Sequence, residues 1–89
     1  MSARVIHKFN LAHGMTLSMP ADASVLSVVE QAGHVMLWAA LDPDAPKVDR
    51  SFRIVGTGYP WPAHIDAAGF IGTIQARSGL VIHVFEVTK

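Results

Sequence analysis

Apolar and polar residues alternate along much of this chain with the two-residue period that indicates half-buried β-strands. The segments that alternate or are rich in β-branched and aromatic residues are 4–11, 15–19, 47–55, 70–76 and 80–88. Between the first two segments stand His13 and Gly14. An X-Gly pair between alternating runs is typical of a tight hairpin turn. We therefore expect the first two strands to pair with each other.

The middle of the chain is less regular. In residues 23–31, Val25, Val28 and Val29 have a helical spacing, and a helix remains the alternative. The many β-branched residues favour a strand, because they pack well on a pleated surface. After a turn at residues 32–33, residues 35–41 are almost all apolar, which predicts a central strand covered on both faces.

Glycine and proline interrupt the pattern most strongly at residues 56–62, Gly-Thr-Gly-Tyr-Pro-Trp-Pro. Gly56 and Gly58 permit positive φ and a close backbone approach. The prolines fix φ and bias the residues before them toward extended conformations. Tyr59 and Trp61 are thereby expected on a stiff corner between two strands.

These elements together predict an all-β, single-domain chain over residues 1–89. The expected fold is a small antiparallel sandwich or barrel of about six to seven strands, with one short helical turn near 62–68 that exposes His64 and Asp66. The residues expected in its core are Trp38, Phe52, Ile54, Phe70, Ile74 and Phe85.

Composition adds an expectation about association. Of the 89 residues, 51% are hydrophobic and 16% are charged, which is more apolar surface than one small core can hide. We therefore expect a homo-oligomer. Seven basic and seven acidic residues give zero net charge without a basic cluster, so we do not expect nucleic acid as a partner.

The sequence contains no cysteine, no apolar run long enough to span a membrane, and no apolar signal region in its first residues. These features favour a soluble cytoplasmic protein without disulfides or thiolate metal sites.

Catalytic and metal-binding patterns are weak. The five histidines lack the spacings that direct two imidazoles of one element at a metal, and each is expected to hydrogen-bond a neighbouring group instead. His7 and His83 would be neighbours only if the terminal strands pair. The Gly-Thr-Gly turn cannot open a helix before the prolines, so it fails as a phosphate loop, and a small anion nest remains the alternative to a purely conformational turn. We expect no enzyme, cofactor or metal.

The corner therefore supplies the candidate site. Exposed Tyr and Trp side chains on a stiff loop commonly anchor partners or stack on flat ligands. The alternative is that they fold back as a plug over the open end of the sandwich. The candidate ligand- or partner-binding residues are Arg53, Thr57, Tyr59, Trp61 and Arg77, in which the arginines would supply charge for a phosphate or carboxylate, while Gly56 and Gly58 form the turn.

Several segments resemble a family of small, uncharacterised, single-domain proteins of tailed bacteriophages and prophages. These segments are Arg-Val-Ile-His-Lys-Phe, Met-Leu-Trp-Ala-Ala-Leu-Asp-Pro, Phe-Arg-Ile-Val-Gly-Thr-Gly, Phe-Ile-Gly-Thr-Ile-Gln and Val-Ile-His-Val-Phe-Glu. The resemblance implies a phage-encoded, non-enzymatic binding protein in the host cytoplasm. Such a protein would neutralise a host factor, by blocking a defence protein complex or by sequestering a nucleotide-like signal. The alternative is a phage structural or assembly protein that uses its apolar surface to oligomerise.

Overall fold

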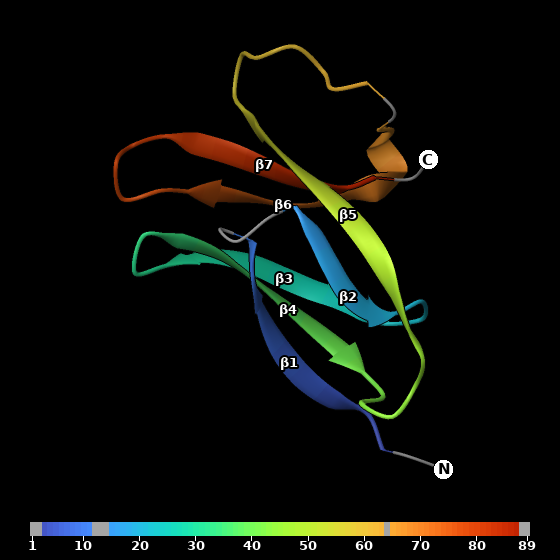
Figure 1. The fold of residues 1–89 in the computed structure, drawn as a ribbon. Helices are drawn as coiled ribbons and strands as arrows, with labels where there is room; N and C mark the ends of the chain where they lie inside the picture. Colours follow the sequence, from blue (N-terminus) through green and yellow to red (C-terminus); the bar gives the residue numbers. More distant parts are fainter. Residues whose placement is uncertain (1–2, 12–14, 64, 88–89) are drawn as a thin grey trace.

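The computed structural model describes residues 3–11, 15–63 and 65–87 and folds them into two antiparallel β-sheets (Figure 1). One sheet has the strand order β1-β4-β3 and the other β2-β5-β7-β6. The strands are β1 (Val5–Asn10), β2 (Thr16–Pro20), β3 (Ser24–Gln31), β4 (His34–Leu41), β5 (Lys47–Gly56), β6 (Phe70–Gln75) and β7 (Val81–Glu86). A 3-10 turn, η2 (Ala67–Gly69), precedes β6. The predicted all-β fold is confirmed, and no helix among the described residues is long and apolar enough to cross a membrane.

The strand predicted over residues 23–31 is confirmed as β3, which pairs with β4 along nearly its whole length. Ala32 and Gly33 join the two strands with φ of 53° and 83°. A two-residue hairpin with positive φ at both positions has the backbone twist that matches its flanking strands. Local turn geometry thus decides this segment in favour of a strand.

The predicted pairing of the first two strands is wrong. β1 pairs with β4, whereas β2 pairs with β5 in the other sheet. The proposed turn at His13 and Gly14 lies outside the described residues. The terminal strands β1 and β7, which carry His7 and His83, belong to different sheets and do not pair.

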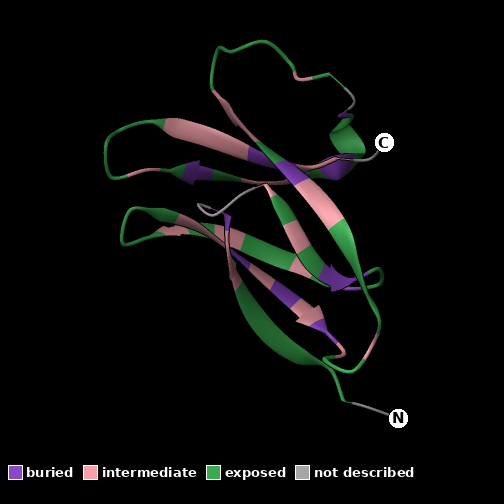
Figure 2. Cartoon of the chain, viewed as in Figure 1, coloured by how far each residue is buried: buried purple, intermediate pink, exposed green. Residues whose placement is uncertain are grey.

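The hydrophobic core lies between the two sheets (Figure 2). On β4 only alternate residues, Leu37, Ala39 and Leu41, are fully buried. Trp38 points to the other face and is only half-buried, with the ammonium of Lys8 5.6 Å from its ring centroid. The prediction that this strand is covered on both faces, with Trp38 in the core, is therefore wrong: β4 is central in its sheet, but no second layer of described residues covers its outer face.

The other predicted core residues divide according to the face they occupy. Phe52 and Ile74 are buried between the sheets, and Ile54 is half-buried against the same core. Phe85 is buried but lies on the outer face of the four-stranded sheet, opposite Phe70. Phe70 is 49% exposed, so its expected burial is wrong. The outer face carries its own small aromatic cluster.

The two sheets approach closely where β3 meets β6. A Cβ atom placed on Gly72 would lie 3.1 Å from Cγ2 of Val28. Such a distance is tighter than ordinary van der Waals contact, so glycine at this position lets the sheets pack directly on each other.

Arg50 closes one end of the core. Its Nε and Nη2 donate to the two carboxylate oxygens of Glu86 at 2.7 and 2.8 Å, while Nη1 donates to the carbonyl oxygens of Pro20 and Ala23 at 3.1 and 2.8 Å. The hydrogen bonds to Glu86 raise the pKa of Arg50 above its ordinary value, although partial burial opposes this. The guanidinium thus ties the turn between β2 and β3 to the second sheet.

Candidate functional site

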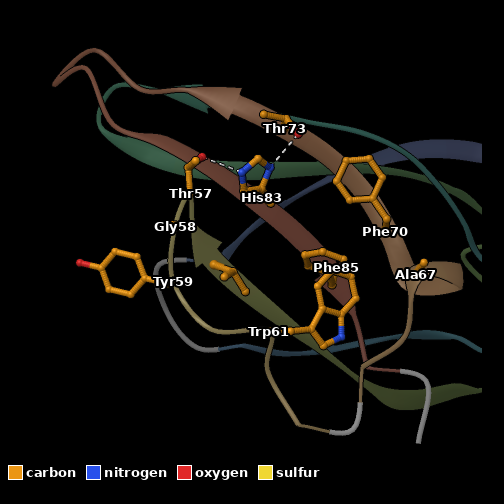
Figure 3. Close-up of a pocket in the computed structure, with 11 residues that line it drawn as sticks. Thr57, Gly58, Tyr59, Trp61, Ala67, Phe70, Thr73, His83 and Phe85 are labelled. Atoms are coloured by element: carbon orange, nitrogen blue, oxygen red, sulfur yellow. Dashed lines mark hydrogen bonds between the residues drawn. The ribbon is translucent and has the colours of Figure 1, made fainter.

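A groove of about 480 Å³ opens on the outer face of the four-stranded sheet, where the 56–62 corner folds over β7 and β6 (Figure 3). Its volume lies within the range of small-molecule and side-chain sites. The residues that line it are Val55, Gly56, Thr57, Gly58, Tyr59, Trp61, Ala67, Phe70, Thr73, His83 and Phe85. Five of the seven predicted site and turn residues are in this set.

Phe85 forms the floor of the groove and is only 5% exposed, although it faces away from the main core. The ring of Trp61 packs against it edge-on, with centroids 5.0 Å apart and planes at 72°. Phe70 packs similarly from β6, at 5.4 Å and 65°. Edge-to-face contacts of this kind are favourable between aromatic rings. The three rings therefore form a continuous apolar platform.

The loop that carries Trp61 is held by hydrogen bonds of its own. The indole Nε1 of Trp61 donates to the carbonyl oxygen of Ile65 at 2.7 Å, and Ile65 is buried. Asp66 accepts from the backbone N–H of Ala68 at 2.9 Å and caps η2. The helical turn expected near 62–68 therefore exists but begins later, after Asp66, which is exposed as expected. His64 lies outside the described residues.

The glycines of the corner have different roles. Gly58 has φ of 88°, which few L-residues adopt. Gly56 has no such φ, but a Cβ there would lie 3.1 Å from Cδ1 of the Tyr59 ring. Its missing side chain lets that ring lie close over the backbone. Both uses of glycine expected from the sequence are present, one at each position.

The sequence left two interpretations of Tyr59 and Trp61, either exposed anchors or a plug over the end of the sandwich. The two residues differ in this respect. Tyr59 is 74% exposed and points outward at the rim of the groove, away from Phe85 and His83 (Figure 3). Trp61 is 58% exposed, yet it also covers Phe85 and fastens its own loop. The exposure of Tyr59 fits the first interpretation, whereas Trp61 combines exposure with the packing expected of a plug.

A polar cluster lies at one end of the groove. Nε2 of His83 lies 2.8 Å from Oγ1 of Thr57, and Nδ1 lies 2.9 Å from Oγ1 of Thr73. The Thr57 hydroxyl also donates to the carbonyl oxygen of Val81 at 3.1 Å. His83 is therefore held between hydroxyls, as expected for a strand histidine. No group of three or more His, Asp or Glu side chains within the described ranges could hold a metal ion.

The chain matches, over residues 2–89, a family model described as "Domain of unknown function (DUF7352)". It belongs to this family. A search of curated proteins and a search of solved structures each found no match.

The two arginines predicted for the site of this DUF7352 protein are not among the residues that line the groove. Arg53 lies on the outer face of β5, but its Nη1 donates to the carbonyl oxygen of Phe52. Arg77 lies in the turn between β6 and β7, where its backbone N–H donates to Glu30. None of the described lining residues is Asp, Glu, Lys or Arg, so the groove lacks the charge expected for a phosphate.

Sequence reasoning missed the lining residues that the sheet supplies from a distance. Phe70, Thr73, His83 and Phe85 come from β6 and β7 and meet the corner only through strand pairing. A signal was present in β7, where His83 and Phe85 share one face and Ile82 and Val84 the other. Both faces of β7 are covered in the structure, whereas the described residues cover only one face of the similarly apolar β4, so this pattern alone did not identify the groove.

Proposed function

We propose that this DUF7352 protein is a non-enzymatic binding protein that neutralises a host factor, and that the groove beneath the 56–62 corner is its binding surface. The observation that carries the proposal is the aromatic platform of Trp61, Phe70 and Phe85, which is partly open to solvent beside the exposed ring of Tyr59. Rigid, exposed aromatic side chains around a preformed groove are typical of binding hot spots.

The chemistry of the groove supports binding rather than catalysis. Both ring nitrogens of His83 have hydroxyl partners, so neither is directed at the open groove as a general base. The described lining residues include no carboxylate to orient that imidazole.

The resemblance to small proteins of tailed phages supports the choice of a host factor as the partner. On this proposal the protein acts in the host cytoplasm, against a defence protein or a nucleotide-like signal. The second candidate, a phage structural or assembly protein, is favoured by the exposed apolar outer face of the β1-β4-β3 sheet around Ile6 and Trp38.

The test is affinity capture from host cells with the wild-type protein and with Tyr59→Ala. Tyr59 is suited to this because its ring is mostly exposed, so its removal should leave the melting temperature within a few degrees of wild type. We expect a retained partner that Tyr59→Ala loses by roughly ten-fold or more, the effect of removing one hot-spot ring.

Ile6→Ala is the matched control, because Ile6 is comparably exposed but lies on the other sheet. Equal capture by wild type and Tyr59→Ala would contradict the proposal. Incorporation of the protein into virions at stoichiometric amounts would support the structural alternative. Trp61→Ala is a poorer test, since it removes both the Phe85 contact and the bond to Ile65.

A further inference from the structure

The hydrogen bonds around His83 determine which polar groups the groove can offer to a ligand. A hydroxyl carries one proton, and the 3.1 Å contact of Thr57 Oγ1 with the carbonyl oxygen of Val81 uses it, because a carbonyl oxygen can only accept. The 2.8 Å contact between Thr57 Oγ1 and His83 Nε2 is then a hydrogen bond only if Nε2 carries the proton and donates. Satisfying both contacts therefore assigns the Nε2–H tautomer to the neutral imidazole.

The same reasoning fixes Thr73. With the proton on Nε2, Nδ1 of His83 is an acceptor, so the Thr73 hydroxyl must donate to it across the 2.9 Å contact. The only proton of Thr73 Oγ1 is thereby used, while its lone pairs stay available. Because Thr73 is exposed and lines the groove, these lone pairs are accessible to an occupant. This end of the groove accepts hydrogen bonds and has no hydroxyl proton left to donate.

The remaining surface is apolar and aromatic, and the described lining residues include no acidic side chain and no Lys or Arg. A phosphate or a carboxylate would find no counter-charge there, and a phosphate oxygen would face the acceptor lone pairs of Thr73. The complementary occupant is a flat, uncharged ring with an N–H or O–H donor at its edge. Among protein side chains, indole and phenol have this combination.

We infer that the groove takes a tryptophan or tyrosine side chain of a partner protein, with the ring on the Phe85 platform and its N–H or O–H donated to Thr73 Oγ1. This inference rests on the proposed binding function and narrows it, since it selects a protein partner over a nucleotide-like signal. On this inference, Thr73 determines the preference for an occupant that carries an N–H or O–H donor.

The test is NMR titration of the whole protein with four small probes. The probes are N-acetyl-tryptophanamide, its 1-methylindole analogue, N-acetyl-tyrosinamide and adenosine monophosphate. We expect millimolar binding of the tryptophan and tyrosine probes, with shifts centred on His83, Thr73 and Phe85. The 1-methylindole analogue should bind about three- to ten-fold more weakly, because it lacks the donor.

Thr73→Val removes the Thr73 acceptor while keeping the shape of the side chain, but it also leaves Nδ1 of His83 without its donor. Its preference for indole over 1-methylindole should therefore be smaller than that of the wild type, whereas Thr73→Ser should retain the full preference. Equal binding of the two indole probes to the wild type would overturn the inference, as would tighter binding of adenosine monophosphate or no groove shift with any probe. The proposed function would fail separately, through equal capture of a host partner by wild type and Tyr59→Ala.

Discussion

At the scale of single residues, Arg50 is the charged side chain that the fold depends on most directly. Its side chain and that of Glu86 are only 15% and 24% exposed, and its remaining N–H groups satisfy main-chain carbonyls. Arg50→Lys replaces a planar fork by a point charge that cannot reproduce these contacts. We expect a loss of about 2–4 kcal/mol in the free energy of unfolding, approaching the cost of breaking a buried pair, measured by urea denaturation.

Arg53→Lys provides the control, because Arg53 is exposed and its Nη1 donates to the adjacent carbonyl oxygen of Phe52. It should change stability by no more than about 0.5 kcal/mol. Similar effects of the two substitutions would contradict the role given to Arg50.

The raised pKa of Arg50 fixes the sign of the pH effect. The stability that Arg50 contributes is complete below the ordinary pKa of arginine and is lost only as pH rises through the raised value.

Part of the difference between Arg50 and Arg53 can be predicted from the sequence. Arg50 shares the inward face of its strand with Phe52 and Ile54, whereas Arg53 occupies the opposite face. A charge in phase with core residues signals a buried partner. What the sequence does not show is that the partner is Glu86, because that pairing depends on β5 lying beside β7.

At the scale of elements, the contact between Gly72 and Val28 sets how closely β6 approaches β3. Gly72→Val would place atoms where Cγ2 of Val28 already lies, and Val28 is β-branched and therefore stiff. We expect a loss of about 1–3 kcal/mol in the free energy of unfolding, the usual cost of overpacking. Urea denaturation with an unchanged m-value would measure it.

The matched test is a double-mutant cycle with Val28→Ala. If the clash is the cause, Val28→Ala should offset much of the damage from Gly72→Val, with a coupling of about 0.5–3 kcal/mol. Purely additive losses would show that the two strands are not limited by this contact. The result would then point to Gly72 acting through its backbone alone.

Element prediction from the sequence succeeded where the signal is local. Residues 23–31 were ambiguous in periodicity, yet β-branched content and the Ala32-Gly33 turn identified a hairpin that the structure contains. The pairing of β1 with β4 instead of β2 was not predictable in this way. Two alternating strands in sequence form a hairpin or enter different sheets according to contacts with strands much further along the chain.

At the scale of the whole molecule, the sequence does not determine which apolar faces are covered. The run 35–41 is apolar on both faces, and burial on both was the natural expectation. Among the described residues, only the face that carries Leu37 and Leu41 is covered by the second sheet, and Trp38 on the other face is half-buried. The same holds for the groove. Its corner can be predicted from the glycines and prolines of residues 56–62, whereas its floor forms only because β6 and β7 lie beneath that corner in the folded sheet.

The partly exposed outer face of the β1-β4-β3 sheet supports the last prediction, which is that the protein associates with itself. Ile6 and Val29 lie on the same outer face as Trp38, and 61% of Ile6 is exposed. Although Lys8 also lies on this face, over the Trp38 ring, an exposed apolar patch in a chain without net charge is expected to pair with a second copy. Light scattering should therefore give at least twice the monomer mass. Ile6→Lys should shift it toward the monomer, because pairing would bury an unpaired charge.

Leu80→Lys serves as the control, because Leu80 is similarly exposed, at 65%, but lies outside that face in the turn between β6 and β7. It should leave the mass unchanged. A wild-type mass equal to the monomer across a hundred-fold range of concentration would refute self-association. A mass lowered by Leu80→Lys and not by Ile6→Lys would instead move the interface to a second hollow, which Leu80 and Tyr59 both line. Self-association would then compete with any partner for the same surface, and Tyr59→Ala would weaken both.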